Sequence, residues 1–348
     1  MSAERRRVTL ADVARMAGVS SASASLILNR RAGTRISSET QERVRTAARE
    51  LGYRPNIAAQ SLRTDKSHTV AFVSDFVSTT RFAARMIRGA MKAADELGQV
   101  LIVVETEGDV EREARAMHTV LDRQVDGIIL AAERARAVDI PDFPDSVNVI
   151  MLNAMNDAHP HAILPDELQG GRTAVRELTA AGHRDIGLVG YDFESGIGGS
   201  SPSVTLERRM HGIREQMAAD RARFIAQGGS RRWEPEEGYR IARAQLRAGP
   251  VRAFLCLNDR LAFGAYQAIA EAGLTIPDDI SVVSFDDDDI SSYLRPGLTT
   301  VALPHEAMGR LAVERLYRGS PAEEVLVAMP SIRRGSVAPL SVGARRTG

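Results

Sequence analysis

From residue 68 onward, short apolar runs alternate with amphipathic stretches that have helical spacing. The strand-like runs are residues 70–73, 100–104, 127–130, 147–152, 186–189, 253–257 and 281–285. The helical stretches between most of them are residues 81–97, 111–123, 170–181, 206–219, 236–248 and 260–272. Strands that are apolar throughout are buried on both faces, which is typical of parallel sheets covered by helices. The pattern therefore predicts an α/β fold with doubly wound parallel sheets.

The alternation divides into two similar halves near Pro165. In doubly wound sheets, ligands bind outside the carboxyl ends of the strands, and pockets form preferentially between domains. We therefore expect two α/β subdomains with a binding cleft between them. At 348 residues, the chain is long enough for a further domain as well.

The amino-terminal residues have a different pattern, that of a small all-α head with three short helices. The first helix is expected to carry one apolar stripe, made of Leu10, Val13, Ala14 and Ala17. Thr9 is placed to cap it, and Gly18 to end it. Ser20 caps the second helix, and the third runs from Ser37 or Ser38 to Leu51, before Gly52.

On the second helix, the larger apolar side chains face inward and leave a small, mostly polar outer face. That face consists of Ser21, Ala22, Ser25, Leu26 and Asn29. A short capped helix with such a face fits the major groove of DNA. The pattern is typical of a helix-turn-helix, although a helical hairpin without a DNA role has the same local geometry.

Charge is distributed unevenly along the chain. The formal net charge is zero, but residues 1–66 hold 13 Lys and Arg against 6 Asp and Glu, about +7, which leaves about −7 for the rest. A basic head on an acidic body suits a DNA-binding module attached to a domain that avoids DNA. A chance cluster of surface charge is the alternative.

The sequence favours a cytoplasmic protein. The single cysteine, Cys256, lies in an apolar run, so we expect a buried thiol and no disulfide within the chain. Residues 5–7 are all arginine, but no apolar segment follows them, so we expect no signal peptide. No apolar run reaches the length of a membrane span.

Residues 53–66 form a segment between the head and the core. Pro55 stands near a helix start and Asn56 can cap it, but a helix of about two turns does not persist alone in water. We therefore expect it to order only against a partner. Leu62 near its end has no local core to enter. It either packs on the next domain or, in a hinge helix, wedges between base steps in the minor groove.

Short motifs stand in order along nearly the whole chain. Those of the head are TLADVA (9–14), AGVS (17–20), SLILN (25–29), LGYRPN (51–56) and AQSL (59–62). Those of the core are RQVDGII (123–129), AGHRDI (181–186), LNDRLAFGA (257–265), IPDDISVVSFDD (276–287) and PGLTTV (296–301). Together they resemble the LacI (lactose-repressor) family. The resemblance implies a homodimeric repressor of operator DNA, with a core like periplasmic sugar-binding proteins.

The resemblance also implies particular DNA contacts. Ser21 and Ala22, just after the capping Ser20, and Leu26 occupy the base-reading positions. The backbone-contacting positions are Thr9, Ser25, Asn29, Tyr53 and Asn56, and Leu62 is the minor-groove wedge. Ala22 and Leu26 cannot form bidentate hydrogen bonds to a base. Readout is therefore expected to depend on thymine methyls, Ser21 and DNA deformability.

By the same resemblance, the core holds an effector cleft. Arg209 corresponds to a ligand-clamping arginine, whose fork can grip vicinal hydroxyls or a carboxylate; a surface arginine beside Arg208 is the alternative. Trp233 corresponds to an aromatic residue that stacks on ligand, with a lid packed on the core as the alternative. The other expected cleft residues are Asp75, Thr79, Phe82, Asn153, Asn258 and Asp286. This set suits a neutral sugar, and residues 195–203 are expected to form a mobile loop over it.

The expected domains are a helix-turn-helix domain at 1–55, a hinge helix or linker at 56–67, and an effector-binding core at 68–341. Within the core, we expect one subdomain at about 68–166 plus 300–330 and another at about 167–299 plus 331–341. No heptad-patterned leucine tail is recognised near the carboxyl end, which favours a dimer over a tetramer.

No catalytic constellation is recognised, and neither a metal nor a cofactor is expected. The acidic run 286–289 lacks the glycine-containing spacing of a calcium loop, and no GxSxG elbow is present. Two rival functions remain. A sugar-transport binding protein shares the core but needs an export signal and no basic head. An enzyme on a doubly wound fold needs the missing catalytic constellation.

Leu62→Ala is expected to weaken binding to operator DNA by roughly tenfold or more, and binding to unrelated DNA by less, because only the specific complex contains the wedge. Gel-shift titrations of both proteins against both kinds of duplex measure this difference. Equal losses on the two duplexes would contradict the wedge.

Overall fold

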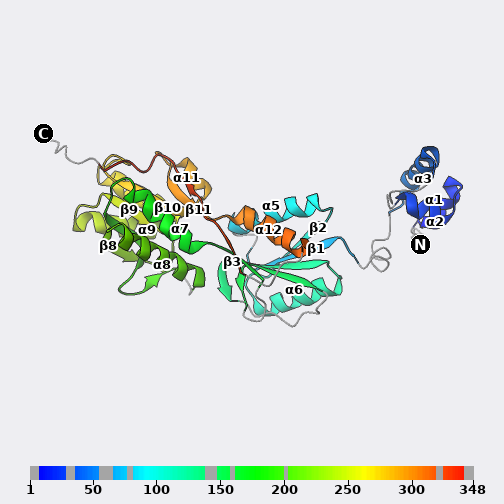
Figure 1. Ribbon diagram of the computed structural model, residues 1–348, viewed down its shortest axis with the longest axis horizontal. Helices are drawn as coiled ribbons and strands as arrows, with labels where there is room; N and C mark the ends of the chain where they lie inside the picture. Colours follow the sequence, from blue (N-terminus) through cyan, green and yellow to red (C-terminus); the bar gives the residue numbers. More distant parts are fainter. Residues whose placement is uncertain are drawn as a thin grey trace, which may run out of the picture. The chain divides into compact units, whose positions relative to one another are not determined.

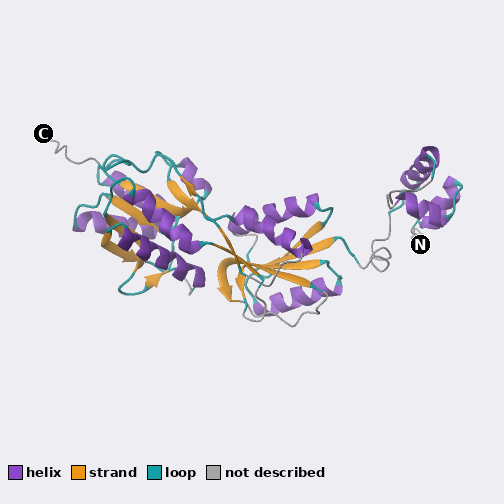
Figure 2. Ribbon diagram, in the orientation of Figure 1, coloured by secondary structure: helices purple, strands orange, loops and turns teal. Residues whose placement is uncertain are grey.

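The computed structural model describes residues 8–28, 36–54, 66–76, 81–137, 147–156, 161–199, 203–318 and 324–340. The chain divides into two compact units, Met1–Ser67 and His68–Gly348. The first unit is helical, and the second contains two β-sheets with their helices (Figures 1 and 2). Four predicted site residues, Asn29, Asn56, Leu62 and Thr79, lie outside the described residues, as does most of the expected hinge segment. No helix of the described ranges is both long and apolar enough to cross a membrane.

The first unit contains the three expected helices, α1 (Leu10–Ala17), α2 (Ser21–Leu28) and α3 (Ser38–Glu50). The Thr9 hydroxyl and the Asp12 carboxylate form a reciprocal capping box at the start of α1. Gly18 ends α1 with a left-handed φ of 66°, and Ser37 caps α3. These local predictions are confirmed.

The three helices share one small apolar centre. Its buried members are Val13, Ala14, Ala17, Ala24, Ile27, Val44, Ala47 and Ala48. Leu10, Leu28 and Leu51 pack around them while partly exposed, and Leu10 belongs to the apolar stripe predicted for the first helix. Because the centre consists mostly of alanine and valine, each helix depends on the other two to remove its apolar stripe from water.

The first sheet of the core is parallel throughout, in the order β12-β5-β4-β3-β1-β2. Its strands are β1 (Thr69–Ser74), β2 (Val100–Glu105), β3 (Gly127–Ala137), β4 (Asn148–Met155), β5 (Ala162–Pro165) and β12 (Val325–Val327). Its helices are α5 (Arg81–Glu96), α6 (Val110–Asp122) and α12 (His305–Arg318). Val70 and Phe72 of β1 pack with α5 and α12, whereas Ala71 and Val73 pack with α6. Since neighbouring side chains of a strand point to opposite faces, helices cover both faces of this sheet.

The second sheet has the order β13-β11-β10-β9-β6-β7, and β8 also pairs with β6. Its strands are β6 (Asp185–Asp192), β7 (Ile197–Gly198), β8 (Arg223–Gly229), β9 (Ala253–Cys256), β10 (Ser281–Asp286), β11 (Thr299–Ala302) and β13 (Ser331–Ile332). Its helices are α7 (Glu167–Thr179), α8 (Val204–Ala219), α9 (Pro235–Ala248), α10 (Asp259–Glu271) and α11 (Asp289–Tyr293). The pairs β6–β8, β6–β9, β9–β10 and β10–β11 are parallel. The predicted fold class, a helical head followed by an α/β core with parallel sheets, is confirmed.

Every strand and helix predicted for the core overlaps an element of the structure. The elements that were not predicted are β5, β7, β8, β11, β12, β13, α11 and α12. Most of these are short, and β8 mixes polar residues and glycines with its apolar ones, so none produces a long apolar run. Part of the expected loop at 195–203 is the strand β7, where Gly198 pairs with Tyr191 of β6.

The chain passes between the two sheets at three places in the described ranges. It leaves the first sheet after β5, returns to it with α12 and β12, and passes to the second again at β13. β11 pairs with β10 of the second sheet, with Thr299 opposite Val283. The return to the first sheet therefore lies after Ala302, slightly later than the expected boundary at about 300.

Helices α7 and α8 pack closely because glycine stands at their contact. A Cβ atom at Gly171 would lie 2.3 Å from the carbonyl oxygen of Arg209, and one at Gly212 would lie 2.1 Å from that of Leu168. Both distances are too short for any side chain against a rigid backbone. The glycines thus permit α8 to lie against the first turns of α7.

Gly212→Ala is expected to destabilise the core by about 1–3 kcal/mol, because the new methyl group forces α7 and α8 apart. Thermal unfolding of the purified protein measures the loss. Gly249→Ala is the matched control, since Gly249 has an extended φ of 171° and open space around it. A Gly212→Ala protein that melts with the control would contradict the close packing.

Candidate functional site

The outer face of α2 is small, mostly polar and accessible. Ser21 and Ala22 are exposed, and Ser25 and Leu26 are half-buried. Ser20 accepts a hydrogen bond at its Oγ from the Ser23 backbone nitrogen at 3.1 Å, which caps the helix. The face has no long side chain that would keep the helix from the base edges of a major groove.

Two other predicted DNA-contact residues, Thr9 and Tyr53, also make contacts within the head itself. The Thr9 hydroxyl donates to Asp12 Oδ2 at 2.6 Å and accepts from the Asp12 backbone nitrogen at 3.3 Å. Tyr53 is half-buried against the apolar centre of the head. Thr9 therefore has a structural role in starting α1, in addition to the predicted contact with the DNA backbone.

In the core, Arg209 is buried at the carboxyl ends of the second sheet. Its Nε donates to Glu167 Oε2 at 2.6 Å and its Nη2 donates to Glu167 Oε1 at 2.8 Å. Its Nη1 donates to the carbonyl oxygen of Leu257 at 2.9 Å. The guanidinium carbon lies 4.3 Å from the ring centroid of Phe285. Arg209 is only 5% exposed, so the alternative of a surface arginine is wrong.

Its neighbour Arg208 has the opposite environment. Arg208 is half-exposed and forms an ion pair with Glu324, with Nη1–Oε1 and Nη2–Oε2 distances of 2.7 and 3.0 Å. A helix turns by about 100° per residue. The two adjacent arginines of α8 therefore point in different directions, and only Arg209 enters the core.

The pKa values of Arg209 and of Asp286, which acts on Arg209 electrostatically, are both perturbed. Burial acts to lower the pKa of Arg209, but the adjacent Glu167 carboxylate outweighs it, so the pKa is raised above its usual value. Burial raises the pKa of Asp286 to about 8, although the positive charge of Arg209 acts to lower it. Asp286 is thus a protonated or partly protonated carboxyl near neutral pH. Such a group can both donate and accept a hydrogen bond.

Asn258 and Trp233 lie together on the same side of the sheet. The Asn258 Oδ1 accepts from the backbone nitrogen of Leu261 at 2.8 Å and so caps α10, and its Nδ2 donates to the Trp233 carbonyl at 3.2 Å. The Trp233 indole donates to the carbonyl of Gly190 at 3.0 Å. The indole of Trp233 is therefore held against Gly190 near the end of β6, and the Trp233 backbone is held by Asn258, the cap of α10.

The predicted residues of the first sheet lie at the ends of its own strands. Asp75 follows β1 and accepts from the Phe76 backbone nitrogen at 2.9 Å. Asn153 lies in β4 with a left-handed φ of 54°, and its Nδ2 donates to the Ala132 carbonyl at 3.0 Å. Both side chains are buried. Phe82 lies in the first turn of α5, and its side chain is outside the described residues.

Sequence reasoning missed Glu167. It is the first residue of α7, directly after the helix cap Asp166, and is 3% exposed. An acidic residue in a first helical turn is common, because its charge interacts favourably with the helix dipole. The position of Glu167 in the sequence alone therefore does not indicate a binding site. Only the packing of α7 on α8 reveals that its carboxylate meets Arg209.

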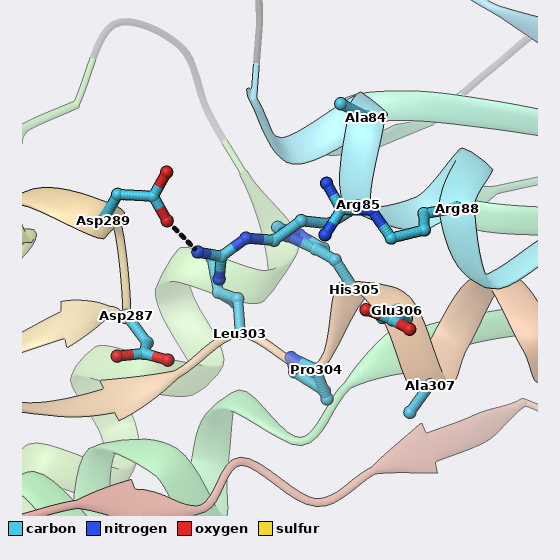
Figure 3. A pocket seen from close by; sticks show the side chains of 10 residues that line it. All are labelled: Ala84, Arg85, Arg88, Asp287, Asp289, Leu303, Pro304, His305, Glu306 and Ala307. Atoms are coloured by element: carbon cyan, nitrogen blue, oxygen red, sulfur yellow. Dashed lines mark hydrogen bonds and ion pairs between the residues drawn. The ribbon is translucent and has the colours of Figure 1, made fainter.

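A pocket of about 460 Å³ lies where the chain passes between the two sheets (Figure 3). Its lining residues are Ala84, Arg85, Arg88, Asp287, Asp289, Leu303, Pro304, His305, Glu306 and Ala307. Figure 3 shows Arg85 of α5 reaching Asp289, 3.0 Å away, beyond the end of β10. Burial lowers the pKa of His305 to about 3, so its imidazole is neutral. Among the predicted effector residues whose side chains the structure describes, none lines this pocket, although Asp287 directly follows Asp286.

The acidic run after β10 is engaged in contacts within the protein. Asp287 pairs with Arg334 at 2.7 Å, Asp288 caps α11, and Asp289 pairs with Arg85. The side chains thus point to different partners. Within the described ranges, no group of three or more His, Cys, Asp or Glu is arranged to hold a metal ion.

Cys256 is buried in β9, as expected, and burial raises the pKa of its thiol. A protonated thiol with no access to solvent is a poor nucleophile. The cysteine is therefore part of the apolar core of the second sheet.

Comparisons with known proteins cover both units. Residues 9–56 match the model of bacterial regulatory proteins, lacI family, and residues 175–337 match that of a periplasmic binding protein-like domain. The chain is 31% identical over 316 residues to the ribose operon repressor of Escherichia coli strain K12, covering 88% of this chain and 92% of the relative. It is 31% identical over 346 residues to the lactose operon repressor of the same strain, covering 98% and 90%.

Among solved structures, the chain is similar to a lac repressor dimer bound to operator and the anti-inducer ONPF. The TM-score is 0.75 at 27% identity, and the match covers 96% of this chain and 100% of that one. The similarity therefore extends over the head and the core alike.

Asp286→Asn is expected to stabilise the protein more at about pH 8.5 than at about pH 5. At the higher pH the wild type must hold a charged carboxylate in a buried position, and asparagine has no such charge. The folded pKa of about 8 exceeds the ordinary value of 3.8. The wild type therefore loses stability as pH rises between these values, and asparagine removes that loss. Melting temperatures at both pH values measure it. The exposed Asp122→Asn is the control, and an equal difference at both pH values would contradict the raised pKa of Asp286.

Proposed function

Because this chain belongs to the LacI family of bacterial regulatory proteins, we propose that it represses transcription by binding a pseudo-palindromic operator as a homodimer. A small molecule, a sugar or sugar derivative, controls that binding from the core. The observation that carries the proposal is the pairing of two parts in one chain. A capped helix-turn-helix with a small, accessible outer face precedes a core with a buried arginine, carboxyl and amide cluster at its strand ends.

In this proposal, residues 1–55 are the DNA-binding domain, 56–67 the hinge and 68–341 the effector-binding core. One core subdomain is built on each sheet. The effector binds between the two subdomains, and a change in their arrangement displaces the paired hinge segments. Because a hinge of about two turns is marginal on its own, a modest change in spacing is enough to weaken DNA binding.

On the DNA side, α2 enters the major groove. Ser21, Ala22 and Leu26 face the bases, and the small size of these side chains leaves readout to apolar contacts and DNA deformability. The phosphate backbone is contacted from Thr9, Ser20, Ser25, Asn29, Tyr53 and Asn56. Leu62 wedges between base steps in the minor groove.

On the effector side, the second subdomain contributes four of the predicted residues. Asp286 ends β10, and Trp233 and Asn258 lie just before α9 and α10. The Arg209 side chain reaches the Leu257 carbonyl just after β9. Doubly wound folds bind ligands at such strand ends. The first subdomain contributes Asp75, Thr79, Phe82 and Asn153. Hydroxyl-rich ligands fit amide, carboxyl and guanidinium groups beside one aromatic ring. The relatives named for the ribose and lactose operons support a sugar.

The rival functions are less well supported. A stand-alone solute-binding protein has no use for the helix-turn-helix head that matches the family model. The relatives reported above are named as repressors, and we propose that the cleft binds its ligand without turning it over, in the cytoplasm where the operator is. No cofactor or metal has a part in this proposal. Turnover of a bound sugar would contradict it.

The proposal is tested by gel-shift titration of the full chain against genomic fragments. We expect a sequence-specific complex whose affinity falls steeply with salt, because phosphate contacts release counterions. Failure to find such a complex at physiological salt would overturn the DNA-binding function.

Arg209→Ala is expected to abolish the response of the operator complex to sugar and to lower the melting temperature, because the Glu167 carboxylate is left buried and unpaired. The folded protein is expected to bind operator within about threefold of the wild type. Gel shifts with and without sugar measure both quantities, and operator binding without sugar also reports folding. Arg208→Ala is the matched control from the same helix, because its ion pair with Glu324 is half-exposed. A sugar response retained in Arg209→Ala would remove Arg209 from the site.

A further inference from the structure

We infer that Glu167 restricts the effector to an uncharged polyhydroxylated molecule, because its carboxylate occupies the face of Arg209 that would otherwise bind an anionic ligand. The inference rests on the proposed function, since it concerns the ligand of the same cleft. It goes further by assigning a specificity-determining role to a residue of α7.

The contact between the two side chains is bidentate. Nε and Nη2 of Arg209 donate to the two oxygens of one carboxylate at 2.6 and 2.8 Å. This is the fork-to-fork geometry by which arginine recognises a carboxylate or phosphate of a ligand. The side chains are 5% and 4% exposed, so solvent does not weaken the pair. An anionic effector would have to displace Glu167 to obtain the same contact.

The fold holds Glu167 in this position. Glu167 is the first residue of α7, and Asp166 fixes the start of the helix by accepting from the Gln169 backbone nitrogen at 3.0 Å. Gly171 and Gly212 let α8 lie directly against α7, which holds the backbone of Arg209 close to the first turn of α7. The two side chains therefore start from neighbouring backbone positions, and little rearrangement is needed for them to meet.

The rest of the guanidinium is also constrained. Its Nη1 donates to the Leu257 carbonyl at 2.9 Å, and the Phe285 ring lies 4.3 Å from its central carbon. A guanidinium carries further N–H groups beyond the three used here. One N–H remains on each of Nη1 and Nη2, and these suit hydrogen bonds to the hydroxyl oxygens of a sugar.

The charges around Arg209 also favour an uncharged effector. The carboxyl groups of Glu167, Asp286 and Asp259 all act on this cluster electrostatically, with Arg209 as the opposing cation. An anionic effector would add a negative charge to a buried region in which Glu167 already neutralises Arg209. Bringing like charges together in a desolvated site is unfavourable, so the arrangement selects against sugar acids and sugar phosphates.

The test compares matched pairs of neutral and acidic sugars. Isothermal titration of the full chain is carried out with D-galactose and D-galacturonate, D-glucose and D-gluconate, and D-ribose and D-ribonate. For the pair that contains the best ligand, the wild type is expected to bind the neutral member about 100-fold more tightly than the acid. Glu167→Gln keeps the shape of the side chain and removes its charge. The Glu167→Gln variant is expected to reduce the ratio of the two dissociation constants, acid over neutral sugar, by about tenfold or more, mainly because it binds the acid more tightly.

Two further variants separate charge from structure. Glu167→Asp keeps the negative charge and is expected to keep the preference for the neutral sugar. Glu324→Gln is the matched control, because it removes the carboxylate partner of the adjacent Arg208 and leaves Arg209 untouched. Melting temperature and operator binding report whether each variant is folded.

The outcomes distinguish the inference from the proposed function. A wild type that binds a sugar acid as tightly as its neutral partner overturns the inference and leaves the sugar-responsive regulator standing. A folded Glu167→Gln protein with an unchanged ratio also overturns it, as does the same change of ratio in Glu324→Gln. Failure of the wild type to bind any member of the pairs, with operator binding intact, contradicts the proposed sugar effector and the inference with it.

Discussion

A buried guanidinium is stable only where opposite charge and hydrogen-bond acceptors surround it, and the second sheet of the core is built around this requirement. Arg209 of α8 meets the Glu167 carboxylate from α7, the Leu257 carbonyl after β9 and the Phe285 ring of β10. Helices and strand ends from distant parts of the chain are therefore held together at one point. If the effector binds here as proposed, little further ordering of these side chains is needed, because the protein itself makes their contacts.

The head is stabilised differently, by local capping and a small shared centre. Thr9 with Asp12, Ser20 and Ser37 begin the three helices, and Gly18 ends the first of them. Small domains of this kind bury little apolar surface and are marginal alone. A DNA-binding unit of marginal stability suits a regulator, since a modest coupling free energy from effector binding is then enough to change its affinity for DNA.

The sequence predicted the fold well wherever the signal was local. Apolar runs identified the central strands, and helical spacing with capping residues identified most helices. The edge strands β12 and β13 are only 3 and 2 residues long, so they leave no readable pattern and are formed by pairing with β5 and β11. The site was predicted less completely. Its arginine, amide, carboxyl and indole residues were expected from a resemblance, and a cleft between the subdomains was expected from the sheet pattern. The residues that line the pocket between the sheets, and Glu167, were not expected.

The sequence by itself determined the periodicity of each element, the caps, the order of the motifs and hence the family, because these depend on residues close together in the chain. The resemblance pointed to Arg209, but the local pattern did not determine which of the adjacent arginines of α8 is buried, because Arg208 and Arg209 are chemically identical and stand side by side. Tertiary structure decided that. The Glu167–Arg209 contact joins residues 42 positions apart, and it exists because two glycines allow α7 and α8 to touch. Arg209 is the buried arginine because it faces the Glu167 carboxylate, which compensates its charge in the desolvated interior.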